Sequence, residues 1–131
     1  MRLALIEHYW NEIDGDVRAV LVDELAKHAA EFAEVQELVI RALDDRHSWV
    51  RRTAARGIIA FRLKAALARV VNELESGDQD TRIAFVDALA SFGSDAVPYT
   101  FVLERLLLLD LSVADRLHIN RALERVRLER K

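Results

Sequence analysis

The segment "WVRRTAARGI" (residues 49–58) has counterparts elsewhere in the chain, and this recurrence is the strongest signal in the sequence. With its first arginine as the register, it aligns with "DVRAVLVDEL" (16–25), "DTRIAFVDAL" (80–89) and "ADRLHINRAL" (114–123). The aligned arginines are separated by 33, 31 and 34 residues: Arg18, Arg51, Arg82 and Arg116. A period of this length is typical of proteins in which each repeat is one pair of helices.

Each aligned segment has the periodicity of an amphipathic helix. Apolar residues stand three and seven positions after each arginine, as Ala54 and Ile58 do in the second segment. This spacing places them on one face of an α-helix. Six positions after the arginine, three of the four segments have a small residue: Gly57, Ala88 and Ala122. A small side chain there would let a neighbouring helix approach closely.

Further helices are expected between the aligned segments, at about residues 2–11, 31–43, 64–75 and 97–109. Six positions before three of the arginines stand residues that favour turns and helix N-caps: Asp45, Ser76 and Asp110. The segment "SVAD" (112–115) has the pattern of a capping box, and Pro98 suits a first helical turn. The sequence therefore predicts about eight short helices, with no competing strand.

The second and fourth segments resemble HEAT or HEAT-like repeats. In that family an aspartate precedes a Val-Arg pair, spaced alanines and a leucine, as Asp45 precedes "WVRRTAARGI" and Asp110 precedes "ADRLHINRAL". The resemblance implies an all-α fold, a right-handed α-solenoid (α-α superhelix), in which helix pairs stack because none buries its apolar face alone. It implies a single HEAT-like repeat domain over residues 1–131, with end helices that act as caps.

The resemblance also gives structural roles to recurring residues. In HEAT repeats the equivalent aspartate and arginine tie successive turns into a ladder. This role is therefore expected for Asp45 with Arg51 and for Asp110 with Arg116. Trp10 is expected in the core, because presumed core positions align with it: Leu43, Leu74 and Leu108.

Composition favours one folded domain. The chain has 131 residues, with four glycines, one proline and no cysteine. The lack of cysteine excludes disulfides, thiolate catalysis and cysteine-ligated zinc or iron-sulfur sites. No apolar run has the length of a signal peptide or a membrane span. A soluble cytoplasmic protein, with no membrane partner, is expected.

The charge is segregated along the chain. Residues 1–45 have a net charge of −7, residues 46–72 have +7 with no acidic residue, and residues 73–131 have −3. Basic charge is therefore concentrated around the second aligned segment. Segregation of this kind can guide encounter with an oppositely charged partner.

No catalytic motif occurs in the sequence. The histidines are scattered, and there is no HExxH, glycine-rich phosphate loop or G-x-S-x-G. Asp44, Asp45 and His47 could in principle ligate a metal, but loop aspartates that cap the next helix explain this cluster more simply. A non-enzyme with no cofactor and no metal site is expected.

Residues that depart from the repeat are better candidates for function. Four of them are expected to be exposed, on the side of their helix away from Val50: Trp49, Arg52, Arg56 and Ile59. The opposite face is expected to be buried and carries Val50, Ala54, Gly57, Ile58 and Phe61. By resemblance, this series of helices lines the concave surface of a solenoid, where partners commonly bind. Tryptophan and arginine are also enriched at binding hot spots.

A structural alternative exists for the arginines, because Arg56 could form lateral ion pairs with Asp23 and Asp87 on adjacent helices. The leading functional hypothesis is a non-catalytic protein-interaction module, such as an adaptor, a scaffold or an inhibitor of the immunity type. Its partner would be a protein with an acidic or mixed surface, and the chain itself a monomer or weak homodimer. A nucleic-acid-binding HEAT-like protein is disfavoured by acidic residues that flank the basic segment: Asp16, Asp23, Asp80 and Asp87. A HEAT-like lyase subunit has no nucleophile or cofactor site in its favour.

Overall fold

The chain is helical throughout the part that the structure describes. The computed structural model describes residues 2–76 and 79–129. Its α-helices are α1 (Arg2–Asn11), α2 (Gly15–Ala26), α3 (Ala33–Arg41), α4 (Ser48–Phe61), α5 (Leu67–Ser76), α6 (Gln79–Ser91), α7 (Thr100–Leu106) and α8 (Val113–Glu129). Three short 3-10 helices join them, at Ala42–Asp44, Lys64–Ala66 and Gly93–Tyr99. These ranges hold no strand, so the predicted all-α class is confirmed.

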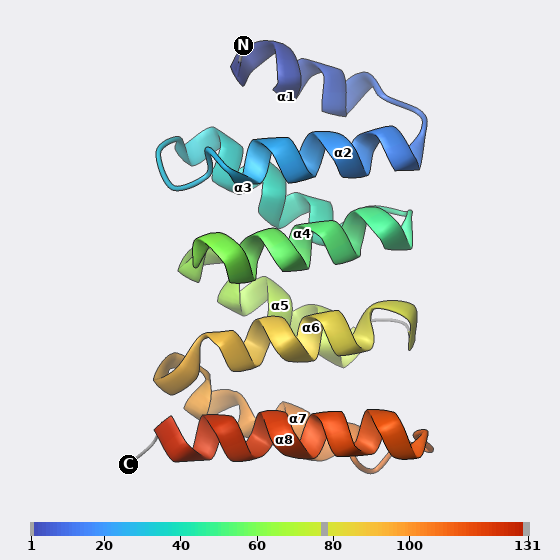
Figure 1. The fold of residues 1–131 in the computed structure, drawn as a ribbon, viewed down its shortest axis with the longest axis vertical. Helices are drawn as coiled ribbons and strands as arrows, with labels where there is room; N and C mark the ends of the chain where they lie inside the picture. The colour runs from blue at the N-terminus through green and yellow to red at the C-terminus, as the bar shows by residue number, and fades with distance from the viewer. Residues whose placement is uncertain (1, 77–78, 130–131) are drawn as a thin grey trace.

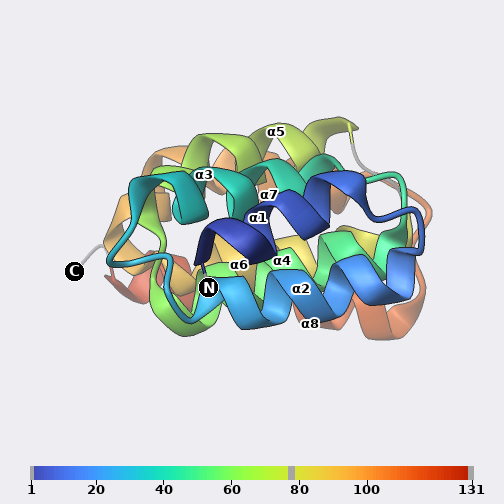
Figure 2. The same cartoon turned by 90° about the horizontal axis from the view of Figure 1, so that it is seen from above.

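The helices form two layers that follow the order of the chain (Figure 1). One layer holds α2, α4, α6 and α8, each packed against the next. Seen from above, α1, α3, α5 and α7 lie along the other side (Figure 2). Each of these contacts the helix that follows it in the chain. The first and last helices therefore lie at opposite ends of the stack.

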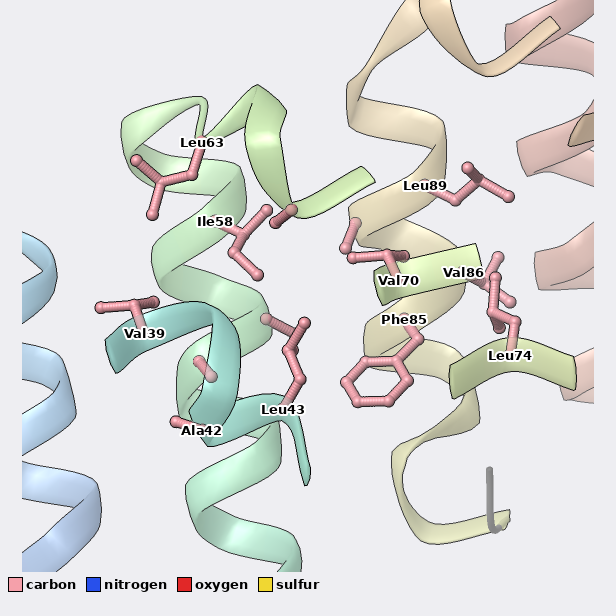
Figure 3. Close-up of a cluster of buried hydrophobic side chains, with 14 of the residues drawn as sticks. Val39, Ala42, Leu43, Ile58, Leu63, Val70, Leu74, Phe85, Val86 and Leu89 are labelled. Atoms are coloured by element: carbon pink, nitrogen blue, oxygen red, sulfur yellow. The ribbon is translucent and has the colours of Figure 1, made fainter. Parts of the chain in front are cut away.

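The core lies between the two layers and continues along the stack. Phe85 on α6 is its largest fully buried side chain. Around it, helices of both layers contribute apolar side chains that are buried almost completely (Figure 3), among them Val39, Leu43, Ile58, Val70, Leu74 and Leu89. Burial of a leucine- or phenylalanine-sized side chain stabilises a fold by about 1.5–3 kcal/mol. Val50, Ala54 and Ile58, which were expected on the buried face of the second aligned segment, are all fully buried.

Gly57 explains how closely α2 and α4 pack. A Cβ atom at this position would lie 2.9 Å from the Cβ of Ala26 on α2. Contacts that short are essentially absent between real side chains, and neither atom belongs to a flexible group. The expectation that a small residue here permits close approach is therefore confirmed.

Local signals at helix ends are partly as predicted. The Ser112 hydroxyl accepts a hydrogen bond from the Asp115 backbone N–H at 3.1 Å, which caps α8 as the "SVAD" pattern indicates. Pro98 lies inside the 3-10 helix before α7 rather than in the first turn of an α-helix. The expected turn role of Ser76 and the acidic contribution of Asp80 depend on side chains outside the described part of the chain.

Three apolar residues that were expected in the core, two from the alignment and one from helical periodicity, are exposed. Trp10 is 54% exposed, Leu108 is 85% exposed and Phe61 is 39% exposed. Trp10 belongs to α1, which packs mainly on α2 and α3 and lies at the end of the stack. Leu108 follows the last turn of α7, and Phe61 is the last residue of α4. Each lies where a helix or the stack ends, so the neighbour that covers the equivalent interior position is missing.

Candidate functional site

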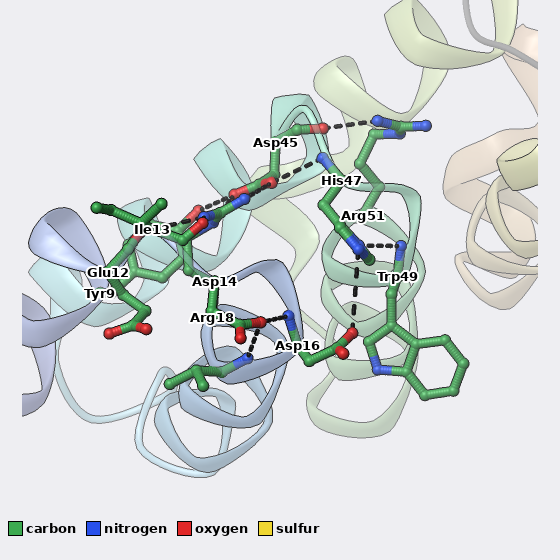
Figure 4. A network of polar contacts seen from close by, with 11 residues as sticks. Tyr9, Glu12, Ile13, Asp14, Asp16, Arg18, Asp45, His47, Trp49 and Arg51 are labelled. Carbon is green, nitrogen blue, oxygen red and sulfur yellow. Dashed lines mark hydrogen bonds and ion pairs between the residues drawn. The ribbon is translucent and has the colours of Figure 1, made fainter.

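The turn before α4 is built by two side chains, Asp45 and His47 (Figure 4). Asp45 accepts a hydrogen bond from the backbone N–H of His47 at 2.9 Å. His47 is the N-cap residue, and its Nδ1 accepts the backbone N–H of Trp49 at 3.2 Å. The prediction that a loop aspartate caps this helix directly is therefore wrong. Instead, His47 caps the helix, and the Asp45 carboxylate accepts the backbone N–H of His47.

Asp45 also joins two successive helix pairs. Arg18 on α2 donates from Nε and Nη2 to the two carboxylate oxygens of Asp45, each at 2.9 Å. Both side chains are only 7% exposed. The hydroxyl of Tyr9 on α1 donates to the same carboxylate at 3.0 Å. The side-chain ion-pair partner of Asp45 is thus Arg18 in the preceding helix pair, whereas the resemblance to HEAT repeats implied Arg51.

The surroundings of Asp45 and Arg18 favour the charged form of both side chains. Burial alone would raise the pKa of Asp45, but hydrogen bonds from Arg18, from the His47 backbone and from Tyr9 lower it below its ordinary value. The bond to Asp45 raises the pKa of Arg18. Burial and the adjacent negative charge raise the pKa of the Tyr9 hydroxyl. Asp45 is therefore ionised and Tyr9 neutral around neutral pH.

Three of the four recurring arginines donate hydrogen bonds to backbone carbonyls. Arg18 donates from Nη1 to the carbonyls of Glu12 and Ile13, and Arg51 donates to the carbonyl of Asp45 at 2.7 Å. Arg116 donates to carbonyls that follow α7, those of Leu107 and Leu109. Each of these arginines therefore satisfies carbonyls in the connection that precedes its own helix, where helix ends leave acceptors without partners. The Asp110 carboxylate, expected to pair with Arg116, has no such partner in the part of the chain that the structure describes.

Trp49 and two arginines form a cluster on the outer side of α4. The Trp49 side chain is 47% exposed. The guanidinium carbons of Arg52 and Arg56 lie 5.4 and 5.8 Å from the centre of its ring. Ile59, one turn further along the same face, is partly buried against the core. The four residues predicted as partner-binding therefore lie together.

Two depressions flank this cluster. Between α4 and α6, a depression of about 380 Å³ is lined by Trp49, Arg52, Arg56, Ile59, Ile83, Ala84 and Asp87. Between α2 and α4, a second of about 450 Å³ is lined by Trp49 and Arg56 together with Ala19, Val20, Asp23, Thr53, Gly57, Ala60 and Phe61. Trp49 and Arg56 line both. We call Trp49, Arg52, Arg56 and Ile59, together with Val20 of α2 and Ile83 of α6, the Trp49 surface.

The arginines of the Trp49 surface do not form the lateral ion pairs that offered a structural explanation for them. No carboxylate in the described ranges lies within ion-pairing distance of Arg52 or Arg56. Asp87, one of the two expected partners, contacts the His118 ring on α8 instead. Among the described residues, Arg56 has one polar side-chain partner, the Thr53 hydroxyl, at 3.4 Å. Their positive charge is therefore free to act on a ligand.

For Arg52 and Arg56, the repulsion between the two positive charges is offset by the attraction of each guanidinium group to the Trp49 ring. Like charges at positions i and i+4 of a helix destabilise it by roughly 0.2–0.5 kcal/mol. Each cation–π contact with Trp49 offsets this by about 0.5–1 kcal/mol at an exposed site. Packing on the indole thus accounts for how two unpaired guanidinium groups are tolerated side by side. The arrangement leaves their N–H groups available for a carboxylate, which arginine can bind through two parallel hydrogen bonds.

Parts of the surface were not singled out by the sequence. Val20 and Phe61 extend it on the side of α2, and Ile83 and Ala84 extend it on the side of α6. Val20 is 67% exposed in the middle of a helix, but its register equivalent Thr53 is buried, so the repeat alignment gave no signal for it. A third, smaller depression of about 190 Å³ continues the row between α6 and α8 and includes His118, Arg121 and Arg125.

The cluster of Asp44, Asp45 and His47 is divided among different partners. Asp44 pairs with Arg69, Asp45 with Arg18, and His47 caps α4. Among residues 2–76 and 79–129, no group of three or more histidine, aspartate or glutamate side chains is arranged to hold a metal ion. None of the described helices has the length and apolar character needed to cross a membrane.

Comparisons with known protein families, with curated proteins and with solved structures found no match for this chain.

Proposed function

We propose that this protein is a non-catalytic protein-interaction module of HEAT-like repeats, arranged as a right-handed α-solenoid, and that it binds a partner protein through the Trp49 surface. In this proposal the layer of α2, α4, α6 and α8 is the concave, partner-facing side. The role would be that of an adaptor, a scaffold or an inhibitor.

The arrangement of the helices supports the repeat assignment. Consecutive helices pack in pairs, α1 with α2, α3 with α4, α5 with α6 and α7 with α8. The second helix of each pair also packs on the second helix of the next pair. Arg18 adds a contact between successive pairs through Asp45. Contacts restricted in this way to neighbouring units are what a stacked repeat requires.

The observation that carries the binding proposal is the half-exposed Trp49 with two unpaired arginines packed on its ring. A large exposed apolar side chain is more informative than an exposed charge, because burial of that side chain would stabilise the protein. Binding hot spots combine such an aromatic with arginine and an apolar surround. Val20, Ile59 and Ile83 supply that surround here.

The proposal is tested by affinity capture with three baits in an extract of the native cells. They are the parent chain, the Trp49→Ala/Arg52→Glu double variant, and an Arg127→Glu control. Arg127 is exposed on α8 and pairs only with Glu104 in the described part of the chain. We expect a protein captured by the parent and the control to be lost from the double variant, whose helicity and melting temperature stay near those of the parent. Equal capture by all three baits would refute the proposed surface.

Binding to a mixed-sequence DNA duplex tests the alternative that the protein binds nucleic acid. Phosphate binding requires a track of cations and weakens steeply with salt. The exposed Asp16, Asp23 and Asp87 on the adjacent helices interrupt such a track. We therefore expect no duplex binding at low salt, and salt-sensitive binding that depends on Arg52 and Arg56 would favour the nucleic-acid alternative.

A further inference from the structure

The positive charge of the Trp49 surface is confined to one helix. Arg52 and Arg56 are one turn apart on α4, and neither pairs with a carboxylate of the described chain. Two guanidinium groups side by side, with no carboxylate of the described chain paired to them, favour the binding of an anion.

An acidic residue beside this site, Asp87, has another partner. Asp87 lines the depression between α4 and α6, but its carboxylate contacts the His118 ring on the next helix. Asp23 lines the depression on the other side of Trp49. The positively charged part of the Trp49 surface, Arg52 and Arg56, is therefore limited to α4 and has an acidic residue on each side. A single carboxylate fits this part of the surface, whereas a repeating polyanion would meet Asp23 or Asp87.

An apolar floor lies directly beside the guanidinium groups. Ile59, Ile83 and Ala84 line the same depression as Arg52 and Arg56, and its volume of about 380 Å³ lies within the range of small-ligand pockets. On the other side of Trp49, Val20 and Phe61 line the second depression. A ligand that reached the arginines would therefore place its neighbouring groups against apolar side chains.

We propose that the Trp49 surface binds an acidic segment of the partner protein, in which a carboxylate is bound by Arg52 and Arg56 and an adjacent large apolar side chain packs on Trp49 and Ile83. This inference rests on the proposed function and specifies the chemistry of the partner. The charge of the site and its apolar floor are complementary to that segment. Trp49, Arg52, Arg56 and Ile83 all line the depression between α4 and α6, so the segment lies in that depression.

The experiment is a selection of short random peptides displayed on phage, against three forms of the full chain. These forms are the parent, Arg52→Glu/Arg56→Glu, and Arg121→Glu/Arg125→Glu. The last pair has the same spacing on α8 and lines the third depression, but no tryptophan lies in that depression. It is therefore a matched control for general electrostatic attraction.

We expect the parent and the control to select peptides in which Asp or Glu adjoins a large apolar residue. The charge-reversed variant should select Lys or Arg at the same position. In a synthetic copy of the strongest peptide, Glu→Gln should weaken binding to the parent by at least about tenfold, the loss expected for a charge-assisted bidentate pair. Binding should change the emission of Trp49, measured in a Trp10→Phe background so that it is the sole tryptophan.

Three results would overturn the inference: no peptide recovered, a selected motif without acidic residues, or peptides that bind the charge-reversed variant as tightly as the parent. These outcomes are distinct from failure of the proposed function. If affinity capture depends on Trp49 but peptide selection fails, the module binds a partner whose recognition does not involve an acidic segment. If capture is unaffected by Trp49→Ala/Arg52→Glu, the proposed function itself is wrong.

Discussion

Replacing Arg18 with methionine is expected to destabilise the protein by about 3–5 kcal/mol, the cost typical of removing one partner from a buried ion pair. Arg18 and Asp45 are each 7% exposed and share two hydrogen bonds of 2.9 Å. Methionine retains most of the apolar stem, so loss of packing contributes little. The cost arises because the Asp45 carboxylate stays buried with only the His47 backbone N–H and the Tyr9 hydroxyl as donors. Against a typical total of about 5–15 kcal/mol, this loss is large.

The measurement is urea unfolding followed by far-ultraviolet circular dichroism. Arg127→Met is the control, because Arg127 pairs with Glu104 at 3.0 Å while both side chains are more than half exposed. That substitution should cost less than about 1 kcal/mol. Adding Asp45→Asn to Arg18→Met should recover about 1–3 kcal/mol, since no uncompensated charge is then buried.

The dependence on pH gives a second test of the same reasoning. Because the pKa of Asp45 is lowered by folding, its contribution to stability is complete above the ordinary carboxyl pKa of about 4 and is lost as pH falls through the folded value. Without Arg18, burial should raise that pKa, so protonation relieves the penalty. The difference between parent and Arg18→Met should therefore shrink on acidification from about pH 7 to about pH 4. A cost no larger than that of Arg127→Met, or one that does not change with pH, would show that the buried Arg18–Asp45 pair does not stabilise the fold in this way.

Three further substitutions address packing and capping. Gly57→Leu should destabilise by about 1–3 kcal/mol or more in thermal unfolding, because even a Cβ there lies 2.9 Å from the Cβ of Ala26; an unchanged melting temperature would contradict the close packing. Ser112→Ala should cost about 1 kcal/mol in urea unfolding through loss of the cap on Asp115, and Ser112→Asp should restore it. Phe85→Ala should cost about 3–5 kcal/mol, because this side chain is the largest that is fully buried, and a cost below about 1 kcal/mol would place it outside the core.

Features of α4 could be predicted because they depend on local periodicity. An α-helix turns by a fixed angle per residue, so the alternation of Val50 and Ile58 with Trp49 and Arg52 fixes which side is buried. The small residue Gly57 could likewise be assigned to a close approach from the repeat alone. These inferences needed no knowledge of which distant residue lies opposite.

Inferences that required a distant partner were less reliable. Asp45 was paired with Arg51 because the resemblance to HEAT repeats implies that pair, whereas Arg18, 27 residues earlier, binds both carboxylate oxygens. Trp10 was placed in the core by alignment with interior repeats, but the end of the stack has no further helix to cover it. Arg56 packs on the Trp49 indole and does not pair with a carboxylate. Which of these contacts forms depends on side-chain conformation and on the contact between His118 and Asp87, which the sequence does not reveal.

The turn before α4 connects the stability of the stack to the position of the candidate site. Asp45, held by Arg18, fixes the backbone of His47, and His47 in turn accepts the backbone N–H of Trp49 (Figure 4). Gly15 at the start of α2 leaves room for the His47 ring, since a Cβ there would lie 2.3 Å from its Cδ2 atom. The backbone of Trp49 is thus anchored through a short series of hydrogen bonds to the preceding helix pair. The indole ring takes no part in that series, so truncation at Trp49 would remove the proposed binding surface while the buried bonds that stabilise the fold persist.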